Sequence, residues 1–138
     1  MTFRTTGQIR SAHIDDTGIV FYPRYFEMLN AAVEEWFARG IGASFNSMHL
    51  DRGIGVPTVQ LSAELEAPST LGEELTILLT PGRIGRSSCC YDAVFTARGL
   101  VRLRATGTLV CMNLETRKSE PWPEDIRERM TQYLVPIV

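Results

Sequence analysis

The chain has little cysteine and little histidine for its length. Its 138 residues include three cysteines, two of them adjacent at Cys89 and Cys90, and two histidines, His13 and His49. Three cysteines cannot build the disulfide framework of a small secreted domain, so we expect reduced thiols and a cytoplasmic location. No cysteine–histidine cluster has the spacing of zinc ligands, so we expect no metal site.

The sequence also lacks an excess of basic residues and any long hydrophobic run. Its formal net charge of −2 argues against a nucleic-acid partner, which would require a basic surface. No run approaches the ~18 apolar residues of a membrane span, and residues 1–6 lack the apolar segment of a secretory signal. We therefore expect no membrane partner and one domain spanning residues 1–138.

The strongest periodic signal predicts a helix of about four turns that begins at Pro23. Apolar residues recur there with helical spacing, at Phe26, Leu29, Val33, Trp36 and Phe37. Proline suits the first helical turn, where its missing N–H costs nothing, and Gly40 is expected to end the helix. At 1.5 Å per residue this helix would be roughly 24 Å long.

Strand patterns surround this helix. Strands are expected over residues 3–12, 59–67, 75–79, 87–98 and 101–109. Residues 41–54 are expected to be irregular or partly helical, residues 81–85 to break the third strand, and residues 125–134 to form a short helix. Short connections favour antiparallel neighbours, and the single helix must bury its stripe on that sheet.

The predicted fold class is therefore α+β, with an antiparallel sheet of about five strands wrapped around one long central helix. Such an arrangement leaves an edge strand in need of cover, which favours self-association. By itself, the acidic Asp-Asp-Thr-Gly sequence before the helix is typical of a turn with a helix cap. The residues that follow it favour a second interpretation.

Residues 15–23, Asp-Asp-Thr-Gly-Ile-Val-Phe-Tyr-Pro, resemble the signature of the 4-hydroxybenzoyl-CoA thioesterase family of hotdog-fold proteins. The family pattern is an aspartate, two residues, a glycine, an aliphatic residue, valine and an aromatic pair before the central helix. The resemblance is dense over residues 13–37 and extends more loosely to about residue 112. Two positions depart from it: His13 replaces a second aspartate of many members, and Asp16 replaces a proline or alanine of others.

The resemblance implies hydrolysis of acyl-CoA thioesters, and the residues fit that chemistry. Asp15 would act as nucleophile, through a mixed anhydride, or as general base toward water. The backbone N–H of Tyr22, at the helix start, would polarise the thioester carbonyl. Gly18 would permit a positive φ or a close approach of the backbone to the thioester.

The neighbouring residues allow two interpretations each. His13 is either a hydrogen-bonded structural residue or a substrate-site residue that tunes Asp15, and Asp16 is either solvated or shares the role of Asp15. The resemblance implies that Arg86, Ser87 and Ser88 bind the phosphates of coenzyme A, although they also fit a charged strand end. Thr58 is expected to line the acyl pocket; these binding residues are Arg86, Ser87, Ser88, Thr58 and His13.

The sequence thus predicts an acyl-CoA thioesterase that is a homodimer or homotetramer, with its site between subunits. No cofactor is expected, because coenzyme A enters as part of the substrate. Two alternatives remain: a noncatalytic hotdog module that binds acyl-CoA or an acyl carrier, and a hotdog hydratase or dehydratase. The latter would require a histidine paired with an acidic residue in a hydratase motif, which His13 lacks.

Overall fold

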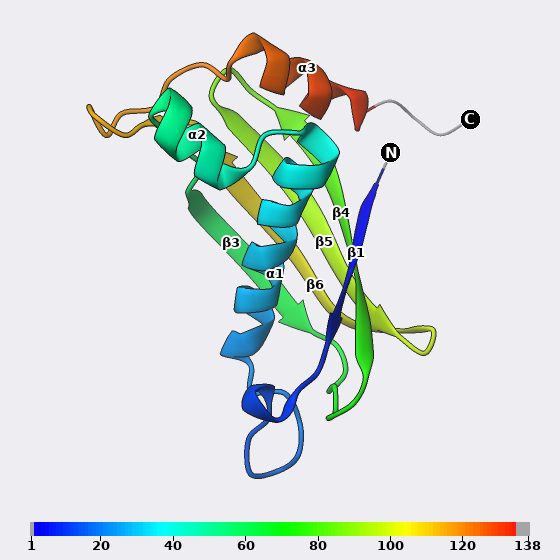
Figure 1. The fold of residues 1–138 in the computed structure, drawn as a ribbon. Helices are drawn as coiled ribbons and strands as arrows, with labels where there is room; N and C mark the ends of the chain where they lie inside the picture. Colours follow the sequence, from blue (N-terminus) through cyan, green and yellow to red (C-terminus); the bar gives the residue numbers. More distant parts are fainter. Residues whose placement is uncertain (1, 135–138) are drawn as a thin grey trace.

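The computed structural model describes residues 2–134 and is built around one five-stranded antiparallel sheet (Figure 1). The strands, in spatial order, are β1 (Phe3–Gln8), β4 (Glu74–Ile84), β5 (Ser88–Ala97), β6 (Leu100–Val110) and β3 (Thr58–Leu65). A small second sheet pairs β2 (Ile54–Gly55) with β7 (Met112–Asn113). The predicted α+β architecture is confirmed.

Helix α1 (Pro23–Glu35) lies across one face of the sheet, as Figure 1 shows. A π-helical segment (Trp36–Ile41) continues it, so the chain turns at Gly42, with φ of +83°, and not at Gly40 as the sequence predicted. Helix α2 (Phe45–Arg52) and helix α3 (Glu124–Gln132) lie together at the far end of the sheet from the start of α1.

The core lies between α1 and the central strands. Its largest fully buried side chains include Trp36, Phe37, Leu29, Leu75, Leu79, Phe95, Leu103 and Leu109. Phe26 was predicted to join this core but is only half-buried, and Tyr25 is buried in its place. The Tyr25 ring packs edge-on against Phe95, with centroids 5.9 Å apart, and its hydroxyl donates to Ser69 Oγ at 3.0 Å. Tyrosine can be buried here because its polar tip has a partner.

Two β-bulges change the strand pattern that the sequence predicted. Residues 81–85 do not break β4: Pro81 pairs with Tyr91 and Arg83 with Cys90, and Gly82 is the extra residue of a bulge. In β6, Leu103 pairs with Phe95 and Val101 with Thr96, so Arg102 is extra. Regular alternation with Val101 and Leu103 would put Arg102 on the solvent face, but the bulge turns two successive side chains inward, and Arg102 is buried.

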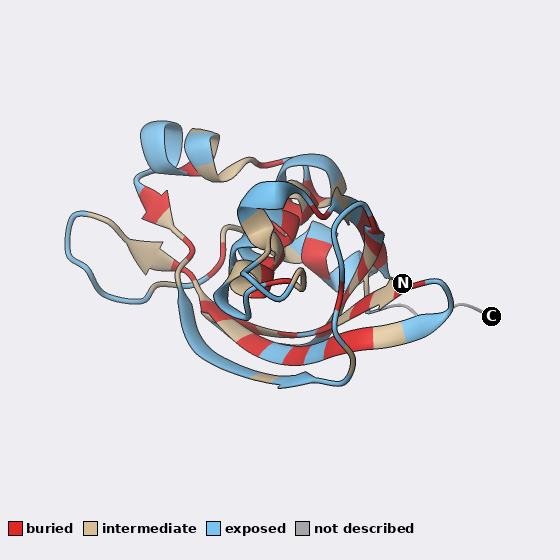
Figure 2. Cartoon of the chain, turned by 90° about the horizontal axis from the view of Figure 1, so that it is seen from below, coloured by how far each residue is buried: buried red, intermediate tan, exposed pale blue. Residues whose placement is uncertain are grey.

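The edge strand β3 is exposed along almost its whole length, unlike its one neighbour in the sheet, β6 (Figure 2). Leu61, Ala63 and Leu65 pair with buried β6 residues and therefore point toward the helix side of the sheet. Ala63 is partly buried against the core, but no described element covers the other two: Leu61 is 40% and Leu65 is 45% exposed. An uncovered apolar edge strand is a site where another chain can pair.

Close packing of the β5 and β6 side chains requires a glycine at position 107. A Cβ at Gly107 would lie 2.5 Å from ring carbon Cζ of Tyr91, which is itself buried. A Cβ at Gly82, the bulge residue of β4, would meet no atom within 4 Å. Both glycines have a backbone that does not require positive φ.

We therefore expect Gly107→Ala to lower the free energy of unfolding by about 1–3 kcal/mol, the usual cost of overpacking a core. Gly82→Ala, the matched control, should change it by less than about 0.5 kcal/mol. Urea unfolding at one fixed protein concentration measures both. Equal effects of the two substitutions would contradict the packing described at Tyr91.

Candidate active site

The acidic loop that precedes α1 is a small hairpin closed by backbone hydrogen bonds. The Phe21 N–H donates to the carbonyl of His13 at 2.8 Å, and the Asp15 N–H donates to the carbonyl of Ile19 at 3.0 Å. At its tip the Gly18 N–H donates to the carbonyl of Asp15 at 3.1 Å, with Gly18 at a φ of +83°. Glycine adopts this left-handed conformation without the steric cost that a side chain adds. The loop therefore has a defined backbone structure, and Asp15 is the first residue of the turn at its tip.

The Asp15 carboxylate is exposed and bound by its own turn. Its Oδ1 accepts hydrogen bonds from the Thr17 backbone N–H, at 2.8 Å, and from the Thr17 hydroxyl. These two bonds, the hydroxyl's first, lower the pKa of Asp15 below its ordinary value. The group is therefore ionised at neutral pH, as both a nucleophile and a general base must be. The Asp15 carboxylate thus fits both interpretations of the loop: it stabilises a turn, and it is in the ionised form that catalysis requires.

The start of α1 offers one free backbone donor next to this loop. Pro23 has no N–H, and the N–H groups of Arg24 and Tyr25 donate to the carbonyls of Phe21 and Tyr22. Within residues 2–134, no acceptor is hydrogen-bonded to the Tyr22 N–H, and no side chain caps the helix. A free N–H at the positive end of a helix dipole suits a developing oxyanion.

The neighbours of Asp15 make different contacts. His13 Nδ1 accepts a hydrogen bond from the Arg10 N–H at 2.9 Å, and no described contact joins its ring to the Asp15 carboxylate. This hydrogen bond fits the structural interpretation of His13. Asp16 is exposed, and its carboxylate bonds to no other described residue.

His13 lies in the acidic loop with Asp15, whereas the other four candidate binding residues lie at the opposite end of the sheet. Arg86 and Ser87 form the turn between β4 and β5, and Ser88 begins β5. Thr58 begins β3 and pairs with Leu109, in the row that ends at Ile84 beside this turn. The acidic loop contacts residues 69 and 70, just before the other end of β4. The 11 residues of β4 separate the acidic loop from the turn that contains Arg86 by about 35 Å, at ~3.3 Å per residue.

Comparison with known proteins decides the family. The model of the thioesterase-like superfamily matches residues 9–130 of the chain. The chain belongs to the thioesterase-like superfamily. This confirms that it is a thioesterase, as the sequence predicted, and that its fold is the hotdog fold.

A curated relative agrees with this placement, and two solved structures share the fold. A 1,4-dihydroxy-2-naphthoyl-CoA hydrolase of Synechocystis is 26% identical over 125 residues, which are 89% of this chain and 90% of that protein. The crystal structure of a 1,4-dihydroxy-2-naphthoyl-CoA thioesterase from Synechocystis matches with a TM-score of 0.88 and 24% identity, covering 99% of this chain and 100% of that one. A Staphylococcus aureus protein solved in complex with CoA matches with a TM-score of 0.92 and 17% identity, covering 100% and 88%.

The thioesterase fold of this chain also contains a hollow of about 510 Å³ away from the acidic loop. It lies at the middle of β3, β5 and β6, and its lining includes Glu64, Asp92 and Arg104. None of the candidate catalytic or binding residues lines it. No cluster of metal-ligating side chains occurs within residues 2–134, and no helix in that range is long and apolar enough to cross a membrane.

Sequence reasoning missed two groups of residues around the loop. Thr17 holds the Asp15 carboxylate, and the Asp-x-Thr spacing typical of a side-chain turn was a usable signal. Glu73 and Arg102 form a buried ion pair next to the loop. The Thr70-Leu-Gly-Glu73 spacing resembles a capping box and could have indicated Glu73. Nothing in the strand pattern indicated that Arg102 is buried, because the bulge that buries it has no sequence signature.

The bonds from Thr17 predict how Asp15 titrates. Thr17→Ala should raise the pKa of Asp15 toward its ordinary value, because the hydroxyl donor is lost. The pKa should still remain below that value, because the Thr17 backbone N–H stays in place. Thr17→Ser keeps the hydroxyl and should leave the pKa near that of the wild type. Carbon-13 NMR titration of the Asp15 carboxyl measures all three, and an unchanged pKa in Thr17→Ala would refute the assignment.

Proposed function

We propose that the chain hydrolyses acyl-CoA thioesters, with Asp15 as the reactive carboxylate and the Tyr22 backbone N–H as the donor to the thioester carbonyl. The observation that carries the proposal is the pairing of a free helix-start N–H with an ionised, exposed carboxylate on the hairpin that leads into that helix. One oxyanion donor of this kind contributes about 10²–10³ in rate.

The reaction has two routes that use the same residues. In the nucleophilic route, an Asp15 oxygen attacks the carbonyl carbon and expels the coenzyme A thiolate, and water then hydrolyses the resulting mixed anhydride. In the general-base route, Asp15 takes a proton from water as that water attacks, and the departing thiolate then receives a proton. In both, negative charge develops on the carbonyl oxygen, where the Tyr22 N–H would donate. Gly18 keeps the backbone of the hairpin in the shape that presents Asp15.

The substrate's coenzyme A portion has its own proposed contacts. Arg86, with Ser87 and Ser88 beside it, suits the phosphates, because guanidinium and hydroxyl groups donate to phosphate oxygens. Thr58 would line the acyl pocket. His13 supports the hairpin through Arg10 and does not contact the carboxylate. No further cofactor takes part, since coenzyme A belongs to the substrate.

A complete site would then need two copies of the chain. The reactive loop and the proposed phosphate site lie at opposite ends of one sheet. If β3 pairs antiparallel with β3 of a second copy, a two-fold axis places the Thr58 end of one strand beside the Leu65 end of the other. Leu61, Ala63 and Leu65 would then be covered. We therefore propose a homodimer as the active unit, which a homotetramer would contain twice.

The acyl group we propose is aromatic. The sequence resembles 4-hydroxybenzoyl-CoA thioesterases, and the Synechocystis relative is named for an aromatic acyl group. Phe21 and Tyr22 leave 50% and 40% of their surfaces exposed beside the loop, where rings could stack on an aromatic substrate. Three free thiols at Cys89, Cys90 and Cys111 fit the reducing cytoplasm in which we place the protein.

The test compares two adjacent aspartates. Asp15→Asn should lower kcat by about 100-fold or more on aromatic and short aliphatic acyl-CoA thioesters, because the amide can neither attack nor accept the proton. Asp16→Asn should keep kcat within about threefold of wild type, because its exposed carboxylate bonds to no described residue. Release of the free thiol is measured over the acyl-CoA panel.

Circular dichroism controls for folding of both variants. Full activity in Asp15→Asn would refute the role of this residue. Absence of thiol release from every thioester by the wild-type protein would instead favour the noncatalytic acyl-CoA-binding module.

A further inference from the structure

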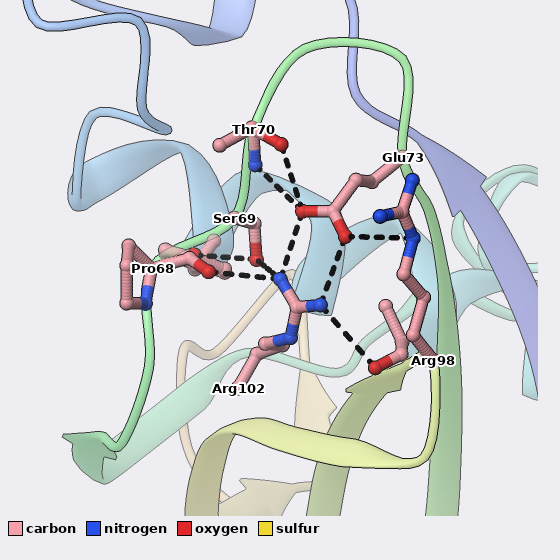
Figure 3. Close-up of polar contacts among 8 residues, drawn as sticks. Pro68, Ser69, Thr70, Glu73, Arg98 and Arg102 are labelled. Atoms are coloured by element: carbon pink, nitrogen blue, oxygen red, sulfur yellow. Dashed lines mark hydrogen bonds and ion pairs between the residues drawn. The ribbon is translucent and has the colours of Figure 1, made fainter.

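A buried ion pair lies under the turn between β3 and β4, and the proposed reaction does not use it. Arg102 Nη1 and Nη2 donate to Glu73 Oε1 and Oε2, each at 2.8 Å, in a bidentate arrangement (Figure 3). The two side chains are 7% and 6% exposed. Hydrogen bonding to Arg102 lowers the pKa of Glu73 to about 2, so the pair is ionised at neutral pH.

Burying this ion pair carries a large desolvation cost. Removing two charges from water costs several kcal/mol per ion, and apolar residues of similar volume often stabilise a fold equally well. The Nε of Arg102 is also buried without a hydrogen-bond partner among the described residues. A role in stability alone therefore accounts poorly for the choice of these residues.

Arg102 Nη2 also donates to the Ala97 carbonyl at 3.3 Å, and Arg98 Nε lies 3.6 Å from Glu73 Oε2, but several further bonds of the pair are directed at the turn. Glu73 Oε1 also accepts from the Thr70 backbone N–H at 2.8 Å and from the Thr70 hydroxyl at 3.1 Å. Arg102 Nη1 donates to the Pro68 carbonyl at 2.8 Å, as Figure 3 shows. The pair thereby fixes the backbone of residues 68–73 at both ends. Charge-assisted bonds of this kind are stronger and more directional than neutral ones.

The turn of residues 68–73 is itself hydrogen-bonded to the segment that carries the candidate catalytic groups. The Ser69 carbonyl accepts the Val20 N–H at 2.9 Å, and the Ser69 hydroxyl accepts the Tyr25 hydroxyl. Ile19 and Thr70 form an isolated antiparallel bridge. Residues 20 and 25 flank Tyr22, so the turn is bonded to the chain on both sides of the proposed oxyanion donor, to the backbone at Val20 and to the side chain at Tyr25.

We propose that Arg102 and Glu73 are positioning residues of the thioesterase reaction. Resting on the proposed function, this inference holds that the pair shapes the turn, and that the turn fixes the Tyr22 N–H relative to Asp15. The pair touches neither the substrate nor the reacting atoms. An error of about 1 Å in such a geometry can cost on the order of 100-fold in rate.

The experiment separates positioning from stability with a double substitution. In Glu73→Leu/Arg102→Met both charges are lost together, so no unpaired charge remains buried. A positioning role predicts a melting temperature near that of wild type and a kcat lowered about 10-fold or more. The KM should stay within about threefold of wild type, because the distant proposed phosphate site is untouched. A folded double variant with wild-type kcat would overturn the proposal.

The control is the ion pair of Arg104 with Glu66, two residues along the same strand. Its N–O distance is 2.6 Å, but its side chains are 56% and 42% exposed. Arg104→Met should leave kcat and KM unchanged, since exposed pairs contribute little. An equal loss of kcat in Arg104→Met would show that the effect is not specific to the buried pair.

A second readout needs neither substrate nor the double variant. Arg102→Lys keeps the charge but loses the bidentate fork. Amide exchange of Val20, whose N–H is bound by Ser69, should accelerate about tenfold or more in this variant, while exchange in β5 stays as in wild type. Unchanged Val20 exchange would overturn the positioning role. If the wild-type protein hydrolyses no thioester, the proposed function fails, and Val20 exchange still tests the link from the pair to the loop.

Discussion

One helix lies on a sheet that is too wide for it. Five strands spaced about 4.8 Å apart span about 19 Å between the outer strand axes, whereas a helix with its side chains is about 10–12 Å across. Helix α1 therefore buries the central strands and leaves β3 uncovered. Leu61 and Leu65 point to the helix side of the sheet but lie beyond the reach of the helix. The same packing fixes the helix start, and with it Tyr22, at one end of the sheet. Both the position of the proposed chemistry and the proposal of a second copy rest on this mismatch in width.

Apart from Thr5 in β1, which bonds Glu35, the buried polar side chains of the described residues gather where the core meets the acidic loop. There Arg102, Glu73 and Ser69 are buried, and their bonds to turn residues link the sheet to the segment that leads into α1. Apolar packing is non-directional, whereas a bidentate ion pair and its backbone bonds specify one geometry. The second kind of contact suits a loop with the proposed task of presenting a carboxylate and an N–H group in one fixed geometry.

The sequence predicted the antiparallel sheet, the long helix and the loop with Asp15 and Gly18, because periodicity and turn chemistry are local signals. It failed where tertiary structure overrides local pattern. The bulge that makes Arg102 an extra residue reverses its side, and the hydroxyl of Tyr25 finds a buried partner only in the folded chain. The distance between Asp15 and Arg86 could not be predicted either, since it depends on strand register.

The central claim is that a complete site combines the Asp15 loop of one copy with the Arg86 turn of another. Mixing Asp15→Asn chains with Arg86→Glu chains, each impaired alone, tests it at substrate concentrations below KM. The account predicts recovery of about a quarter of wild-type activity, because half of randomly formed dimers are mixed and each holds one intact site of two. Activity equal to the average of the two separate variants would place both residues in one chain's site and contradict the account.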